Sequence, residues 1–330
     1  MTRWRGRLRV ETVLPGVSLV VTLVAFVVAA AAIGRSISPY DGYNALQGFA
    51  QLGLLALPLG LTMIAGEFDL SVAGVYALAG MLTVQFGQQQ PLLGVGVAVV
   101  TGALVGAFQG GLIARFRLPS MPVTIASYII LLGVTSFISG GLTKTYTNAD
   151  ATAFVDQPVL TLFSPRSLIT LALFVAIGLI LSFSRLGSEL RAIGGDRRAA
   201  RASGVRTDGL LVGLFTASGA LAAVGGSLLS ISYSSANPDP GIQPLVLAVV
   251  AALIGGVSLA GGRGSAWGLL VGAVVVALLS QIVIFATLPG YVTQLVFAGF
   301  LLIVIAVDAP GVRRRVAAYV DARQLRGTRE

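Results

Sequence analysis

Long apolar runs separated by short polar breaks dominate the pattern of hydrophobic and polar positions along this 330-residue chain. A helix that crosses the hydrocarbon core of a bilayer needs about 20 consecutive, mostly apolar residues. By that rule the sequence predicts ten membrane-spanning helices and, as fold class, an all-α integral membrane protein. The predicted spans are residues 13–33, 44–65, 69–87, 91–113, 120–140, 167–184, 209–231, 245–260, 266–287 and 291–308.

The composition supports a membrane protein. Hydrophobic residues make up 55% of the chain and charged residues only 11%, whereas about 25% of a typical soluble domain is charged. A net charge of +9 would suggest a nucleic-acid partner in a soluble protein. Here the basic residues flank apolar runs, so membrane orientation explains them and we expect no nucleic-acid partner.

The basic residues also predict the orientation of the helices. With the N-terminus inside and ten spans, only Arg35, Lys144 and Arg166 of the 22 basic residues fall on the outer side. Cytoplasmic segments of membrane proteins are enriched in lysine and arginine. We therefore expect both termini in the cytoplasm: a basic N-terminus (1–12), one transmembrane domain (13–308) and a basic tail (309–330). Two sets of five oppositely oriented helices would permit a 5+5 inverted repeat, although no self-similarity supports one.

The first apolar run has two interpretations. Arg3, Arg5, Arg7 and Arg9 precede it and an alanine run ends it, as in a signal peptide. Its length exceeds the about 7–15 apolar residues of a signal peptide, so a retained helix is the better prediction.

Residues 184–206 form a polar island between two apolar runs, with six arginines and only two acids, Glu189 and Asp196. Such an island predicts a loop outside the membrane. Residues 190–193 and 197–202 are predicted to form short amphipathic helices, separated at Gly194–Gly195. We interpret the island as a docking surface, where Ala199 and Ala200 would let a helix fit a groove. The arginines could pair with acids of a partner, but retention at the anionic inner leaflet, worth about 1 kcal/mol each, explains most of them.

Polar residues within or beside the spans are candidates for a solute pathway. The break at residues 66–69 brings Glu67 and Asp69 either into a pore or to the membrane interface as helix caps, and both alternatives stay open. Polar side chains in spans can equally hold helices together by hydrogen bonds. The candidate pathway residues are Asn44, Gln47, Gln51, Asp69, Ser71, Thr124 and Ser127.

Two sets of glycines repeat every four residues, which would leave one face of a helix without side chains and favour close helix packing. They are Gly102, Gly106 and Gly110, and Gly264, Gly268 and Gly272.

The chain lacks both cysteine and histidine. Thiolate nucleophiles, disulfides and imidazole metal sites are therefore excluded, and no catalytic residues or metal site can be assembled. A membrane-embedded enzyme is thus disfavoured. Ion-coupled transporters usually carry ionisable residues inside their spans, and only Asp69 and Asp308 qualify here. An ion-coupled secondary transporter of a small polar solute remains the alternative function.

Three segments, GEFDLSVAGVYALAG, RLGSELRAIGGDRRAARASGV and AALIGGVSLAGGRGSAWGLLVGA, together resemble the permease subunits of bacterial ABC sugar importers of the ribose/xylose/galactose type. The resemblance runs from about residue 45 to 308. In the first segment Glu67-Phe68 and Ala73 depart from the family pattern G-I-D-L-S-V-G. In the second, Asp196 replaces a common asparagine and Val205 an isoleucine. The third matches at Gly255, Gly256, Ser258, Leu259, Ala260, Gly261, Gly262 and Gly264.

The resemblance implies a multi-pass protein of the bacterial inner membrane that imports a monosaccharide or a related polyol or nucleoside. Its implied partners are a second permease subunit (homo- or heterodimer), two ATPase subunits that carry the ATP and magnesium, and a periplasmic or lipid-anchored sugar-binding protein. This chain itself would hold no cofactor. The residues implied to couple to the ATPase are Ala192, Gly194, Gly195, Asp196, Ala199, Ala200, Ser203 and Gly204.

Overall fold

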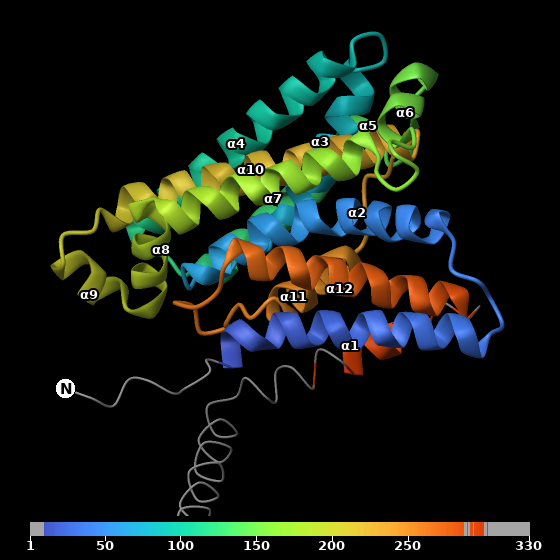
Figure 1. Cartoon of the computed structure of the whole chain (residues 1–330). Coiled ribbons are helices and arrows are strands. Elements are labelled where there is room, and N and C mark those ends of the chain that lie inside the picture. Colours follow the sequence, from blue (N-terminus) through green and yellow to red (C-terminus); the bar gives the residue numbers. More distant parts are fainter. Residues whose placement is uncertain (1–9, 287–288, 290, 293, 300–301, 303–330) are drawn as a thin grey trace, which may run out of the picture. The chain divides into compact units, whose positions relative to one another are not determined.

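The computed structural model describes residues 10–286, 289, 291–292, 294–299 and 302 (Figure 1). Residues up to Ala286 form one unit, and those from Thr287 onward form a second. The predicted tail 309–330 lies outside the described residues, as do most of the basic N-terminus and much of the tenth predicted span, 291–308.

The first unit is almost entirely helical. Its helices are α1 (Val10–Ala32), α2 (Pro39–Ile64), α3 (Val72–Phe86), α4 (Pro91–Phe116), α5 (Ser120–Ser139), α6 (Ala149–Asp156), α7 (Pro165–Phe183), α8 (Arg185–Gly195), α9 (Arg197–Ala202), α10 (Thr207–Ser232), α11 (Gln243–Ile254) and α12 (Ala266–Phe285). Two short strands, β1 (Lys144–Thr145) and β2 (Ser235–Ala236), pair antiparallel.

Seven of the described helices are long and apolar enough to cross a bilayer, namely α1, α2, α4, α5, α7, α10 and α12. Two more predicted spans are helical but short: α3 has 15 residues and α11 has 12. At 1.5 Å per residue, α11 reaches only about 18 Å, less than the about 30 Å of a bilayer core. The all-α membrane fold is confirmed, while ten spans, cytoplasmic termini and the inverted repeat stay predictions.

Helix α11 ends at Ile254, not at residue 260 as predicted. The next residues form a loop in which Gly256, Gly261, Gly262 and Gly264 all have positive φ. Only glycine adopts positive φ angles without strain. Because an α-helix requires negative φ, a helix cannot continue through these four glycines. Gly264 therefore lies in this loop, and its prediction as part of a helical glycine ladder was wrong. Gly268 and Gly272 do lie on α12, where they face the carbonyls of Ala251 in α11 and of Gly255 directly after it.

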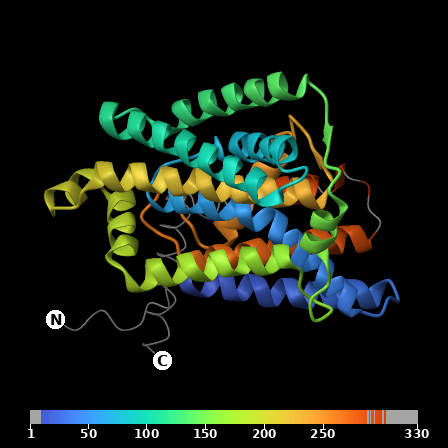
Figure 2. The same ribbon diagram turned by 90° about the horizontal axis from the view of Figure 1, so that it is seen from above.

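Helices α2, α3 and α10 form the centre of this unit. Helix α10 packs against α4, α3 and α2, while α2 also packs against α11 and α12, and α12 against α1 (Figure 1). The pair α8 and α9 lies at one end of the long helices and α6 at the other (Figure 2). We call these the α8–α9 end and the α6 end.

The first glycine set brings the α4 backbone against α10. A Cβ atom on Gly106 would collide with the carbonyl of Phe215, and one on Gly102 with the carbonyl of Gly219. Because both collisions are with backbone, neither can be relieved by a side-chain rotation.

Alanine at Gly106 is therefore expected to lower the free energy of unfolding by about 3 kcal/mol, at the upper end of the usual cost of overpacking. Gly111 is the matched control, because a Cβ atom there meets nothing within 4 Å. Thermal melting of both purified variants in detergent should show a lower melting temperature for Gly106→Ala alone. Equal melting of the two would contradict the backbone contact.

Candidate functional site

The α8–α9 end carries the polar island, residues 184–206, which we call the α8–α9 strip. The two helices separate at Asp196, not at Gly194–Gly195 as predicted, because α8 continues through both glycines. Asp196 has extended backbone angles, and its Oδ1 accepts the N–H groups of Arg198 at 2.8 Å and Ala199 at 3.0 Å. It is thus the N-cap of α9. These backbone bonds hold the pKa of Asp196 below its usual value.

The strip has a buried and an exposed face. Leu190, Ile193 and Ala200 are buried, with at most 4% of each residue exposed. Ala200 was predicted to meet a partner, and its burial assigns it to the inner face. The predicted coupling residues that are exposed are Ala192, Gly195, Asp196, Ala199, Ser203 and Gly204. These six residues have short side chains, and the exposed residues around them on the strip include Arg191, Arg198 and Arg201.

Three glycine-bearing segments meet behind this face. The N–H of Gly262 donates to the carbonyl of Ile64 at 2.9 Å. A Cβ atom on Gly194 would collide with the Ile64 carbonyl and the Gly262 nitrogen, and one on Gly261 would lie 2.5 Å from the Gly66 Cα. We call this contact the glycine junction (Gly66, Gly194, Gly261 and Gly262). It joins α8 to the end of α2 and to the loop before α12 with no side chain between.

The segment after the junction, residues 66–71, is held by a buried polar cluster. Asp69 is only 2% exposed. Its Oδ2 accepts the hydroxyl of Ser218 on α10 at 2.7 Å, and its Oδ1 accepts the hydroxyl of Ser71 at 2.5 Å and the Ser71 N–H at 3.2 Å. The Asp69 carboxylate thus caps the start of α3 and ties it to α10. The sequence suggested that Asp69 either lines a pore or caps a helix at the membrane interface. Neither alternative included this contact with α10.

The same segment is fixed to α4 and α5. Ser71 Oγ lies 2.8 Å from Gln109 Oε1 on α4, while the buried Gln109 Nε2 has no partner among the described residues. The Ser71 hydroxyl has one proton, which it donates to Asp69, so it cannot also donate to Gln109 Oε1. Rotating the Gln109 amide by 180° would instead let Nε2 donate to the Ser71 oxygen. On the α5 side, Thr124 Oγ1 donates to the Phe68 carbonyl at 2.9 Å.

Two arginines of the strip bind acids of the chain itself. Arg197 Nη1 lies 3.5 Å from Glu67 Oε1, and Arg197 Nη2 lies 3.3 Å from Asp208 Oδ1. Arg201 Nη2 lies 2.5 Å from the same Asp208 oxygen. Burial raises the pKa of Glu67, and a bond to Ser120 and the charge of Arg197 act against that rise. Arg197 therefore links α9 to the segment after α2, a role that neither sequence interpretation of the arginines gave it.

The candidate pathway residues lie in three places. Asp69, Ser71 and Thr124 lie in the buried cluster near the α8–α9 end. Asn44, Gln47 and Gln51 lie in the first half of α2, and Ser127 is half-buried on α5. The seven therefore do not lie in one place, and their role in transport stays a prediction.

Sequence reasoning missed the charged pair beside Gln47. Asp156 ends α6 and Arg166 lies in the first turn of α7, with Arg166 Nε 3.3 Å from Asp156 Oδ1. Arg166 was noted only as one of three outer basic residues. Its position at the start of an apolar helix, in a chain otherwise poor in charge, was the available signal.

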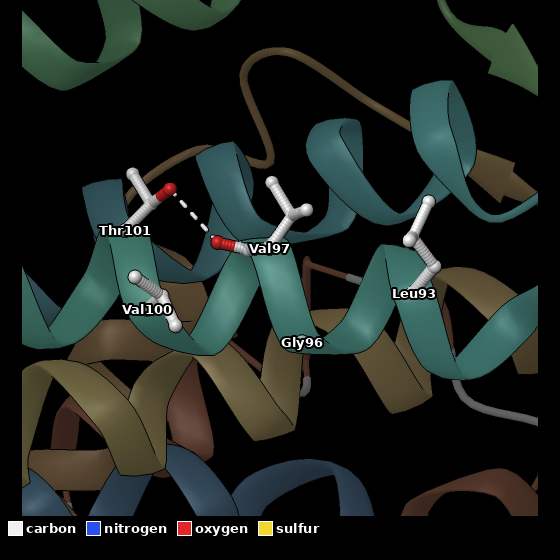
Figure 3. Close-up of a pocket in the computed structure, with 5 residues that line it drawn as sticks. All are labelled: Leu93, Gly96, Val97, Val100 and Thr101. Atoms are coloured by element: carbon white, nitrogen blue, oxygen red, sulfur yellow. Dashed lines mark hydrogen bonds between the residues drawn. The ribbon is translucent and has the colours of Figure 1, made fainter.

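A shallow pocket on α4 is no candidate site. Leu93, Gly96, Val97, Val100 and Thr101 line it, all from this one helix (Figure 3). Its single polar side chain, Thr101, donates to the Val97 carbonyl of the same helix at 2.8 Å. The pocket thus offers no free polar group to a solute. No group of three or more metal-binding side chains occurs within the described part of the chain.

Comparison with known proteins gives a consistent result. The chain is 30% identical to the fructose import permease protein FrcC of Rhizobium meliloti, over 92% of this chain and 86% of that protein. It is 29% identical to the ribose import permease protein RbsC of Escherichia coli K12, over 81% and 84%. It is 26% identical to the L-arabinose ABC transporter permease protein AraH of Azospirillum brasilense, over 88% and 86%. No solved structure matches the chain.

A family profile covers most of the spans. The profile described as "Branched-chain amino acid transport system / permease component" matches residues 43–306. That range includes the glycine junction, the α8–α9 strip and the cluster around Asp69. The chain therefore belongs to this family of transport-system permease components.

Proposed function

We propose that this chain is the membrane-spanning subunit of an ATP-driven importer of a monosaccharide or a related polyol or nucleoside, in the bacterial inner membrane. A separate ATPase would bind ATP and magnesium and dock on the exposed face of the α8–α9 strip. A second permease subunit and a soluble or lipid-anchored sugar-binding protein would complete the importer. The family description names branched-chain amino acids. The three relatives named above are sugar permeases, and their similarity favours a carbohydrate.

The observation that carries the proposal is the convergence of three separate segments on the glycine junction, next to an exposed, arginine-rich strip. A displacement of α8 would act directly on the end of α2, because Gly194 packs against the Ile64 carbonyl without an intervening side chain. The cluster around Asp69 then connects the same segment to α10 and α4. Packed interfaces move between discrete arrangements rather than bending continuously, so a displaced α8 would reposition several helices together.

The proposal predicts that bulk on the exposed face blocks coupling. Gly195 is exposed, and a Cβ atom there meets nothing within 4 Å, so we expect Gly195→Trp to fold and to obstruct a docking ATPase. We expect ATP-driven uptake into proteoliposomes that contain the assembled importer to fall at least about tenfold, the effect of 1.4 kcal/mol at the interface.

Gly133 on α5 provides the matched control, because it is exposed and has equal free space. Gly133→Trp should leave uptake unchanged. Normal uptake by Gly195→Trp would remove the docking role of this face. Uptake by the chain alone under an ion gradient would refute the ATP-driven importer and favour the ion-coupled alternative.

A further inference from the structure

At the α6 end, far from the α8–α9 strip, a polar cluster gathers around one face of α2. Tyr43, Gln47 and Gln51 follow each other at four-residue intervals and so share that face. Asp156 from α6, Arg166 from α7 and Ser232 from α10 reach the same place. Four helices thus contribute polar side chains to one site in a chain whose membrane-spanning helices are mostly apolar.

The charges in this cluster are poorly placed for their own helices. Asp156 is the last residue of α6 and Arg166 is in the first turn of α7. A helix carries partial negative charge at its C-terminus and partial positive charge at its N-terminus, so each residue adds to charge of its own sign. Helix stability does not explain either residue. Ionisable groups in membrane proteins are costly and generally mark functional sites.

The hydrogen bonds of the cluster are unevenly distributed. Gln47 Oε1 accepts from Arg166 Nη2 at 2.9 Å, from Arg166 Nε at 3.3 Å and from the Ser164 hydroxyl at 3.0 Å. An amide oxygen has only two lone pairs, so this acceptor is overcommitted. Yet Arg166 Nη1 has no partner among the described residues, although Arg166 is only 4% exposed. A buried donor without an acceptor carries a free-energy cost that a suitable ligand would remove.

Besides its ion pair with Arg166, the Asp156 carboxylate binds two neutral groups that a solute hydroxyl could replace. Asp156 Oδ2 accepts the hydroxyl of Ser232 at 2.5 Å, and Asp156 Oδ1 accepts Gln47 Nε2 at 3.1 Å. Farther along α2, the Tyr233 hydroxyl donates to Gln51 Oε1 at 2.9 Å, and Tyr233 is 57% exposed. A solute hydroxyl both donates and accepts, so it can replace the Ser232 hydroxyl on Asp156 and offer its oxygen to Arg166.

From this geometry we propose that Arg166 and Asp156, with Gln47, form a binding site for the hydroxyl groups of the transported solute at the α6 end. The site rests on the proposed function for its solute class, a neutral polyhydroxylated molecule. In the arrangement described here its groups bind each other. Solute would bind by exchanging those internal bonds for bonds to its own hydroxyls.

The test uses the assembled importer in proteoliposomes, with its ATPase and binding protein and a radiolabelled panel of D-ribose, D-fructose and L-arabinose. Each sugar is compared with its monodeoxy analogues at saturating binding protein. Asp156→Asn keeps the size of the side chain and removes its charge, whereas Arg166→Lys keeps the charge and removes the planar set of guanidinium donors. Asp150→Asn is the control, since Asp150 is an exposed aspartate of the same helix.

For the two variants we expect uptake of the preferred sugar to fall about tenfold, the effect of one lost hydrogen bond to a charged group. The preference for that sugar over one deoxy analogue should shrink as well, while binding-protein-stimulated ATP hydrolysis stays within about twofold and Asp150→Asn behaves like the wild type. Unchanged uptake overturns the site. An equal loss for sugar and deoxy analogue also overturns it, because a purely structural role lowers both alike.

Failure of the proposed function gives a different result. Wild-type uptake that continues without ATP would refute the ATP-driven importer. The sugar preference of the variants could still be measured, and that measurement alone would support or overturn the hydroxyl site.

Discussion

Replacing Gly194 by alanine is expected to lower the free energy of unfolding by about 3 kcal/mol and to abolish uptake, whereas the same change at Gly195 leaves uptake unaltered. The two glycines are neighbours in α8, but a Cβ atom at Gly194 collides with backbone of Ile64 and Gly262, and one at Gly195 meets nothing within 4 Å. Overpacking against backbone costs 1–3 kcal/mol or more. At Gly195, alanine removes only glycine's excess backbone entropy and raises stability by up to about 0.5 kcal/mol.

The measurement pairs thermal melting of each purified variant with ATP-driven uptake by the reconstituted importer. Because both substitutions add one methyl group to adjacent helical positions, differences in helix propensity cancel. Similar melting temperatures and uptake for the two variants would contradict the glycine junction. Normal melting with lost uptake in Gly194→Ala would keep the junction as a coupling element and remove its contribution to stability.

The helices themselves were largely predictable because length and apolarity decide which segments enter a bilayer. The predicted helix boundaries were wrong where contacts between helices determine where a helix begins or ends. Helix α8 continues through Gly194 and Gly195, although glycine is a weak helix former, because Gly194 fits against the Ile64 backbone. Gly264 followed the four-residue spacing of α12, yet its φ of 137° belongs to a loop. Spacing alone cannot distinguish a glycine that packs a helix from one that turns a chain.

The candidate site was only partly predictable for a related reason. The exposed part of the α8–α9 strip follows from its polarity, since a charged segment between apolar runs must leave the membrane. The contacts within the chain could not be predicted. Arg197 of the strip binds Glu67, 130 positions away, and at the α6 end Arg166 binds Gln47, 119 positions away. These pairings depend on how α2, α7 and α9 pack. Composition shows that the acids are few, which limits the candidates, but only packing selects among them.

The buried carboxylate of Asp69 gives a prediction that separates the two functions considered for this chain. Asp69→Ala is expected to lower the free energy of unfolding by about 3 kcal/mol, because the buried Ser71 N–H and the hydroxyls of Ser71 and Ser218 lose their acceptor. Asp69→Asn keeps one carbonyl oxygen for Ser71, and its amide can donate to the Ser218 hydroxyl, which is free to rotate. Its cost should be about 1 kcal/mol, measured by thermal melting.

Uptake by Asp69→Asn then distinguishes the mechanisms. If ATP drives transport through the α8–α9 strip, Asp69 serves only to hold α3 against α10, and the amide should retain at least about half of wild-type uptake, in line with its small structural cost. If a proton or sodium gradient drives transport, the buried carboxyl is the natural carrier of the coupling ion. An amide neither binds a proton at physiological pH nor supplies a negative charge, so the same variant would then be inactive although stably folded.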